Sequence, residues 1–279
     1  MTNHHPQDTA AAAQKHLATL HDAFTATTGG EISDPAAQAA WDRSATAHNA
    51  LAARPGVTLS GDENLVVVLH PGFDILDVIG PYYFLSSMIG ATIHLATTGA
   101  AAEPVTSANG LPLIPTTTLA EVPKTPTVLL VPGGDTKVLL TDPAAMTMIR
   151  RLGTTAATVA SVCTGAIALA AAGLLTRRRA TSHWSVRHLL AGYGAIPVDE
   201  RVVADGNILT AAGVTAGMDL ALTLVGRLRG NDYARFLELG AEYAPQPPFG
   251  AGTPDTAGTE LTALAHDFFA TIEHDLRAH

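Results

Sequence analysis

The sequence predicts an α/β fold: a doubly wound, mostly parallel sheet with helices on both faces, preceded by a helical extension. Short, continuous apolar runs alternate with segments at helical spacing, as expected of parallel strands that are covered on both faces. The first 60 residues differ, because they are rich in Ala, Thr and His and poor in Val and Ile. We therefore divide the chain into a helical extension at 1–60 and an α/β domain at 61–279 that ends in a helix.

Composition narrows the class of protein. The 279 residues are 47% hydrophobic and 15% charged, which is enough apolar material for a sizeable core. The net charge of −9 disfavours a nucleic-acid partner. The single cysteine excludes an internal disulfide and suits a cytoplasmic protein. The sequence has no signal-peptide pattern and no apolar stretch long enough to cross a membrane.

The extension is predicted to contain two helices. Leu17, Leu20 and Phe24 fall at helical spacing in the first. Asp34-Pro35 is typical of a helix start, with an N-cap followed by Pro, and Trp41 lies on that second helix. We interpret the five histidines of this region as surface residues without metal-ligand spacing: His4, His5, His16, His21 and His48.

The elements of the α/β domain follow in order. Apolar runs predict strands at 65–69, 128–131 and 158–162, and 91–97 is predicted to be a further strand. Asn109-Gly110 predicts a turn, and Asp205-Gly206 predicts a hairpin between two short apolar runs. Helices are expected to begin near Asp77, Asp142, Cys163, Val186 and Gly217. The last helix carries an apolar stripe made of Leu261, Leu264, Phe268, Ile272 and Leu276.

Cys163 lies where the apolar run at 158–162 changes into a small-residue helical pattern. A strand that turns sharply into a helix at a nucleophile exposes that side chain above the carboxyl end of a sheet. The helix N-terminus lowers the pKa of such a thiol and favours the thiolate. A cysteine among Val and Ala is also common as a small buried apolar residue. The pattern alone leaves both interpretations open.

Two further features fall at the ends of predicted strands. Asp77 comes shortly after the first strand, and Gly133-Gly134 directly follows the third. In parallel sheets, ligands bind outside the carboxyl ends of the strands. The fold is therefore expected to bring these residues close to Cys163, which favours its interpretation as a nucleophile.

Each of these residues has a chemical and a structural interpretation. Gly134 and Thr164 are placed to offer backbone N–H groups to developing charge, but a tight turn and a helix cap are the alternatives. Asp77, with its pKa raised by burial and a neighbouring thiolate, could act as an acid near neutral pH. Its alternative is an N-cap.

The sequence lacks a P-loop, a dinucleotide glycine fingerprint and a zinc-spaced cluster, so we expect chemistry without a cofactor or metal. Cysteine hydrolases use a histidine base, but the residue after Cys163 is Thr164. For His183 we favour a structural or surface role, and its approach to the site stays open.

Several segments carry a family resemblance. The first set is typical of the PfpI-type, glutamine-amidotransferase-like superfamily: Asp77–Pro81, Val131–Gly134, Ser161–Ala166 and Ala170–Leu175. The second set resembles the isocyanide hydratases within it: Arg179–Trp184, Glu200–Thr210, Val214–Gly217 and Glu242–Phe249. The resemblance runs from about Leu65 to Ala257 and implies a flavodoxin-like fold.

This resemblance implies a cofactor-independent hydro-lyase that converts a small isonitrile and water to an N-substituted formamide. In that family the Cys sulfur attacks the terminal isonitrile carbon, and water hydrolyses the resulting thioimidate. Carried over, Cys163 is the nucleophile and Asp77 is the neighbouring acid/base group. The other catalytic or pocket residues are then Thr164, Gly133, Gly134, Val214 and Ala212. The resemblance also implies a homodimer with the Cys site near the subunit interface.

Two departures and two alternatives accompany this resemblance. Ala211-Ala212-Gly213 stands where the family has a run of glycines, which predicts a narrower or stiffer pocket, and His70 replaces an apolar residue. The first alternative is another PfpI-type Cys hydrolase or glyoxalase, against which Thr164 argues. The second is a non-enzymatic redox sensor or ligand-binding module that uses the thiol.

Overall fold

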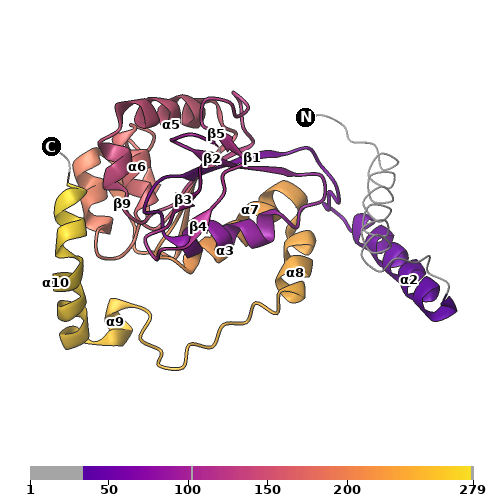
Figure 1. Ribbon diagram of the computed structural model, residues 1–279. Coiled ribbons are helices and arrows are strands. Elements are labelled where there is room, and N and C mark those ends of the chain that lie inside the picture. Colours follow the sequence, from indigo (N-terminus) through magenta and orange to yellow (C-terminus); the bar gives the residue numbers. More distant parts are fainter. Residues whose placement is uncertain (1–33, 102, 278–279) are drawn as a thin grey trace. The chain divides into compact units, whose positions relative to one another are not determined.

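The computed structural model describes residues 34–101 and 103–277 (Figure 1). They form two compact units. The larger unit comprises the described residues within 63–83, 92–221 and 244–279. The smaller unit comprises the described residues within 1–62, 84–91 and 222–243. The predicted first helix, with Leu17, Leu20 and Phe24, lies outside the described residues, as do His4, His5, His16 and His21.

The larger unit is built on a seven-stranded sheet with the order β10-β11-β7-β6-β1-β2-β5. Neighbouring strands are parallel, except that β10 and β11 form an antiparallel hairpin. The strands are β1 (Asn64–Leu69), β2 (Thr92–Thr97), β5 (Thr117–Thr118), β6 (Val128–Val131), β7 (Thr158–Val162), β10 (Val202–Asp205) and β11 (Ile208–Ala211). The central strands β1, β6 and β7 are almost wholly buried, which accounts for their continuous apolar runs. The predicted flavodoxin-like, mostly parallel fold is confirmed.

Helices cover both faces of this sheet (Figure 1). One face carries α5 (Pro143–Thr155), α6 (Gly165–Ala171) and the 3₁₀ helix η1 (Arg187–Tyr193), whose apolar residues form a core with the strands. The other face carries the first turns of α3 (Ile75–Leu85) and α7 (Ala216–Arg229). These turns approach closely at Gly217, where a Cβ would lie 3.1 Å from Pro81 and 3.2 Å from Val162.

The remaining elements of this unit are short or terminal. They are α4 (Lys137–Leu140), α9 (Pro254–Ala257), α10 (Thr259–Asp275), the antiparallel pair β3 (Val105–Thr106) and β4 (Pro112–Leu113), and the parallel pair β8 (Arg179–Ala180) and β9 (Ile196–Pro197). The turn predicted at Asn109-Gly110 joins β3 to β4, and Gly110 has a φ of 85°. The helix predicted near Val186 is a 3₁₀ helix that begins one residue later.

The smaller unit contains the confirmed helix of the extension, α2 (Pro35–Ala52). The Asp34 side chain caps it by accepting a hydrogen bond from the Ala36 N–H at 2.9 Å. The unit also contains α8 (Asn231–Gly240), which the sequence analysis did not identify. Buried Tyr233 of α8 donates its hydroxyl hydrogen to the Ser87 carbonyl at 3.1 Å and accepts from the Ile89 N–H. These bonds fix α8 within its own unit.

The loops that follow β1 and β6 pair with each other at the carboxyl edge of the sheet. The Asp74 N–H donates to the Gly133 carbonyl at 3.0 Å, and the Asp135 N–H donates to the Gly72 carbonyl at 2.8 Å. Strand β7, which ends at Cys163, lies beside β6. The three strand-end features predicted from the sequence therefore meet at one edge.

Candidate active site

Cys163 occupies a strained elbow between β7 and α6. Its φ of 57° lies in the left-handed region, which a non-glycine residue adopts only at a cost. Two hydrogen bonds from other segments hold the Cys163 backbone in this conformation. The Cys163 N–H donates to the Ala212 carbonyl at 3.0 Å, and the Cys163 carbonyl accepts from the Ser182 hydroxyl at 2.8 Å. Gly165, two residues further on, lies so close to the Val131 carbonyl that a side chain does not fit at position 165.

Asp77 lies in the first turn of α3 and is fully buried. Its Oδ2 accepts a hydrogen bond from the Gly133 N–H at 2.8 Å, whereas its Oδ1 has no hydrogen-bond partner among the described residues. The alternative that Asp77 caps the helix is wrong. Asp74 has that role, since its Oδ1 accepts from the Leu76 N–H at 3.0 Å.

The surroundings of Asp77 favour its protonated form. Burial raises the pKa of this carboxyl well above its usual range, and the negative charge of Asp74 raises it further. The Gly133 N–H and a contact with the Cys163 thiol act in the opposite direction. The predicted rise of the Asp77 pKa therefore agrees with the structure. The second cause, after burial, is the charge of Asp74 and not the neighbouring thiolate that was expected. A buried acid with one free oxygen can deliver a proton to a molecule in the adjoining space.

The Cys163 thiol departs from the sequence-based expectation. Burial raises the pKa of this thiol well above the usual range, and the negative charge of Asp77, when that carboxyl is ionised, adds to this effect. The backbone N–H groups of Thr164 and Val214 act in the opposite direction. The predicted lowering of the thiol pKa is wrong, because desolvation outweighs the favourable potential of a short helix N-terminus. The thiol is protonated at neutral pH until its proton is transferred.

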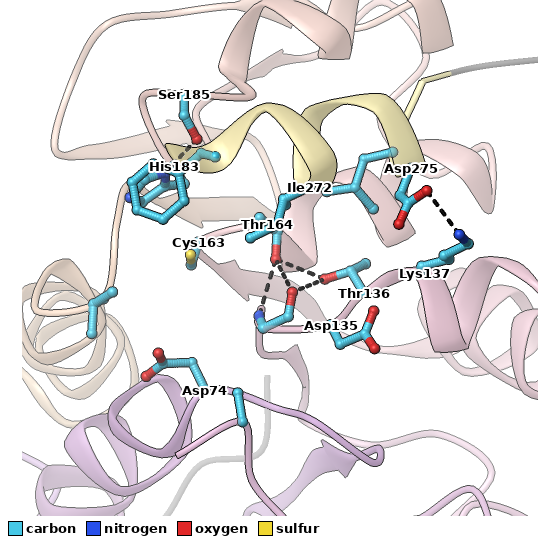
Figure 2. Close-up of a pocket in the computed structure, with 15 residues that line it drawn as sticks. Asp74, Asp135, Thr136, Lys137, Cys163, Thr164, His183, Ser185, Ile272 and Asp275 are labelled. Carbon is cyan, nitrogen blue, oxygen red and sulfur yellow. Dashed lines mark hydrogen bonds and ion pairs between the residues drawn. The ribbon is translucent and has the colours of Figure 1, made fainter. Parts of the chain in front are cut away.

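The Thr164 side chain turns toward the loop after β6 and does not cap α6. Its Oγ1 accepts from the Gly134 N–H at 3.1 Å and is hydrogen-bonded to the Thr136 hydroxyl at 2.7 Å (Figure 2). The Gly134 N–H, predicted to face developing charge, is therefore engaged by Thr164. The pair of glycines brings the β6 loop into contact with both the elbow and Asp77.

Gly133→Ala should destabilise the protein. The added Cβ would lie 2.5 Å from Thr164 Oγ1, 2.6 Å from the Thr164 nitrogen and 2.9 Å from Asp77 Oδ2. Overpacking of this kind costs about 1–3 kcal/mol, which corresponds to a Tm lower by roughly 2–12 °C in a thermal melt. Gly99→Ala is the matched control, because its Cβ would meet only Thr97 Oγ1, at an ordinary 3.7 Å. Equal melting temperatures for the two variants would contradict the tight fit described.

The loop after β11 closes another side of the elbow. Val214, with a φ of 36°, lines a cavity together with Cys163. Ala212 was predicted to line the same pocket. In the structure it supplies the carbonyl that holds the Cys163 backbone and lines another cavity of about 640 Å³, which shares Val214 and His183 with the first. Gly213 is confined by His183, whose Cδ2 would lie 2.6 Å from an added Cβ.

The cavity above Cys163 has a volume of about 350 Å³ and is predominantly apolar. Figure 2 shows Cys163 between Asp74, which approaches from the loop after β1, and helix α10. Gly134, Thr164 and Val214 of the predicted site line it, whereas Gly133 and Asp77 are not among its lining residues. The size and lining are those of a site for a small, mostly apolar molecule.

His183 lines this cavity, in contrast to the role expected from the sequence. Its Nδ1 is hydrogen-bonded to the Ser185 hydroxyl at 2.8 Å, and its ring packs edge-on against Phe269 with 5.3 Å between centroids. Burial lowers the pKa of His183 to about 4, so the ring is neutral at pH 7. The cavity wall therefore carries a neutral imidazole beside the thiol.

Sequence reasoning missed the contribution of α10. Phe269, Ile272, Asp275 and Leu276 form one wall of the cavity, although they lie more than 100 residues after Cys163. The apolar stripe of this helix was visible in the sequence, but a stripe does not say which surface it covers. Among the residues that the structure describes, no group of three His, Cys, Asp or Glu side chains is placed to hold a metal ion. None of the described helices combines the length and apolar character needed to span a membrane.

The parallel sheet, the strained Cys elbow and the adjoining buried carboxyl define a known class of proteins. Residues 63–227 match the DJ-1/PfpI family, and the chain belongs to that family. Within it, the chain is 45% identical over 190 residues to a protein from Pseudomonas putida named isonitrile hydratase, and the match covers 68% of this chain and 82% of that one.

Solved structures agree with this assignment. A THiJ/PfpI family protein from Pseudomonas syringae superposes with a TM-score of 0.77 and 39% identity, over 80% of this chain and 92% of that one. A DJ-1 superfamily protein from Salmonella typhimurium, crystallised as a cysteine-to-alanine mutant, superposes with a TM-score of 0.59 and 25% identity. That match covers 66% of this chain and all of the other.

Proposed function

We propose that the protein is an isonitrile hydratase that converts R–N≡C and water to the formamide R–NH–CHO through a thioimidate on Cys163. The observation that carries the proposal is the pairing of a buried thiol, Cys163, which lines an apolar cavity, with a neighbouring buried carboxyl, Asp77, whose surroundings favour its protonated form. The 45% identity to the Pseudomonas putida isonitrile hydratase supports the same reaction.

The first step is addition of the thiol to the terminal isonitrile carbon. That carbon accepts both a proton and a nucleophile, so a neutral acid and a neutral thiol are the partners it needs. Asp77 gives its proton to the carbon as the sulfur attacks, and the thiol proton passes to Asp77. The product is the thioimidate R–N=CH–S–Cys163, with Asp77 protonated again. The Thr164 and Val214 N–H groups that face the sulfur stabilise the thiolate character that develops there.

The second step is hydrolysis of the thioimidate. Water attacks the same carbon as Asp77 protonates the nitrogen, and Asp77 takes up the proton that the water loses. This gives R–NH–CH(OH)–S–Cys163 with Asp77 protonated again. The C–S bond then breaks, the hydroxyl proton returns through Asp77, and the formamide leaves with the thiol and the carboxyl both restored. All atoms balance as one isonitrile plus one water, and no cofactor takes part.

The charge of Asp74 should set the alkaline limit of activity. Because Asp74 raises the pKa of Asp77, Asp74→Asn lowers that pKa and deprotonates the acid at a lower pH. The variant keeps an oxygen to cap α3. The alkaline limb of the kcat/KM profile should therefore move to lower pH, with a rate roughly three- to tenfold below wild type on that limb. An unmoved limb would exclude Asp77 as the acid that titrates there.

The alternatives have less support from the site. A redox-sensing cysteine needs thiolate character and exposure, whereas Cys163 is buried and its pKa is raised. A Cys hydrolase of the superfamily would need a histidine base beside the sulfur, and Thr164 occupies the position after Cys163. His183 lines the cavity, so this second alternative stays in the test below.

The test uses liquid chromatography to measure how the wild-type protein converts phenyl isonitrile to formanilide. We expect enzyme-dependent formanilide and no turnover of aldehyde or peptide substrates. A folded protein that converts aldehydes or peptides but no isonitrile would support the Cys hydrolase. Inactivity toward every substrate, together with a stable sulfenic or sulfinic acid on Cys163, would support the sensor.

The homodimer implied by the family resemblance is a separate part of the proposal. Size-exclusion chromatography with light scattering should give about twice the chain mass of 28.8 kDa. A monomer at micromolar concentration would contradict it without bearing on the chemistry.

A further inference from the structure

Helix α10 forms the outer wall of the cavity above Cys163. Ile272 and Asp275 of this helix line the cavity, and Figure 2 shows Asp275 directed toward Lys137. Phe269 lines the cavity beside them and packs against both His183 and Trp184, with 5.3 Å and 6.1 Å between ring centroids. The wall opposite the thiol is therefore made of an aromatic ring and a branched aliphatic side chain.

The C-terminal half of α10 is firmly held in this place. Leu276, directly after the helix, is 1% exposed, and its carbonyl accepts from the Tyr193 hydroxyl at 2.9 Å. Asp275 forms an ion pair with Lys137 at 2.7 Å. At the other end of this half, the His266 ring packs edge-on against Trp184 with 4.8 Å between centroids. A wall anchored at both ends limits the space above the sulfur in a defined way.

The charges around the cavity are mostly negative. Asp74, Asp135 and Asp275 line it, and Lys137 is the one positively charged side chain among the described lining residues, with His183 neutral. The Lys137 charge is balanced by Asp275. Asp74 acts on Asp77, Cys163 and His183 alike, raising the pKa of each, so its field reaches across the cavity. A negatively charged substituent would meet repulsion there.

We propose that α10 is the specificity-determining wall of this site, and that Phe269 and Ile272, with the acidic surroundings, select compact, apolar isonitriles without negative charge. This proposal rests on the proposed hydratase function. It assigns the choice of substituent to a helix outside residues 63–227, the part that matches the family.

The size of the substituent is tested with phenyl and 4-biphenylyl isonitrile. Wild type should prefer the phenyl compound, and Phe269→Ala should raise the ratio of kcat/KM for biphenylyl over phenyl by roughly tenfold or more. Leu264→Ala is the matched control, because this side chain of the same helix is 62% exposed and does not line the cavity, and its ratio should stay within about twofold of wild type. Ile272→Ala, at a half-exposed position that tolerates truncation, should shift the ratio in the same direction as Phe269→Ala.

Charge is tested in the wild-type protein with 4-isocyanobenzoate. Its kcat/KM should be at least about tenfold below that of phenyl isonitrile at low salt, and the gap should narrow at high salt. Two results would overturn this inference without affecting the proposed function. One is an active wild type with an unchanged biphenylyl-to-phenyl ratio in both Phe269→Ala and Ile272→Ala, and the other is equal kcat/KM for the charged and neutral compounds. Absence of any isonitrile turnover by wild type would instead overturn the proposed function.

Discussion

Cys163→Ala should abolish formamide formation while leaving the fold intact. The sulfur is the atom that forms the covalent intermediate, and the chain has no second cysteine to replace it. We expect the rate to fall by at least about 10³-fold in an assay of formanilide production. The thiol is buried but small, so its loss should lower the free energy of unfolding by only about 1 kcal/mol, which a thermal melt measures.

Cys163→Ser provides the control for size. The hydroxyl fills nearly the same space but is a much poorer nucleophile without an adjacent base, so this variant should also be inactive. Substantial turnover by a folded Cys163→Ala protein would remove the covalent mechanism, whatever the serine variant does.

Asp77→Asn should lower the catalytic rate and raise the stability of the fold. The amide keeps an oxygen that accepts from the Gly133 N–H, but it has no proton to deliver, so kcat should fall by about 10²–10⁴-fold with little change in substrate binding. The variant should also melt at a higher temperature. The folded state of wild type resists ionisation of this buried carboxyl, so raising the pH above 3.8, its usual pKa, costs wild-type stability.

The pH dependence separates this effect from simple repacking. The difference in Tm between Asp77→Asn and wild type should be small near pH 4 and should grow as the pH rises toward the raised pKa of Asp77. Each kcal/mol corresponds to about 2–4 °C in a domain of this size. Asp267→Asn, at an exposed carboxyl on α10, should change neither the rate nor the melting temperature. An Asp77→Asn protein with wild-type kcat would return Asp77 to a structural role.

The sequence was informative wherever chemistry follows a strand end. The elbow at Cys163, the glycines after β6 and the carboxyl group after β1 could all be placed at one edge, because parallel strands align their carboxyl ends. Local signals also located the cap of α2 at Asp34 and the hairpin of β10 and β11. Each of these predictions depends on residues within a few positions of one another.

The missed features depend on distant contacts. The thiol pKa was predicted in the wrong direction because the potential of a helix end is visible in sequence, whereas burial by α10, Val214 and the loop after β1 is not. His183 and Phe269 contact each other across more than 80 residues, so no local pattern could bring them to the cavity. Ala212 was assigned to the pocket by the family resemblance, but after β11 its carbonyl is turned toward the Cys163 backbone instead.

The most direct test of the covalent mechanism is the mass of Cys163 during turnover. Wild-type protein and Asp77→Asn are mixed with phenyl isonitrile, quenched over the first turnovers, and digested for peptide mass spectrometry. The mechanism predicts a mass increase equal to one isonitrile on the peptide that contains Cys163 in the wild-type protein. This increase should form far more slowly in Asp77→Asn, which lacks the proton for the first step, and should be absent from Cys163→Ala. Formamide release during the first turnovers with Cys163 unmodified throughout, or an adduct on another residue, would contradict it.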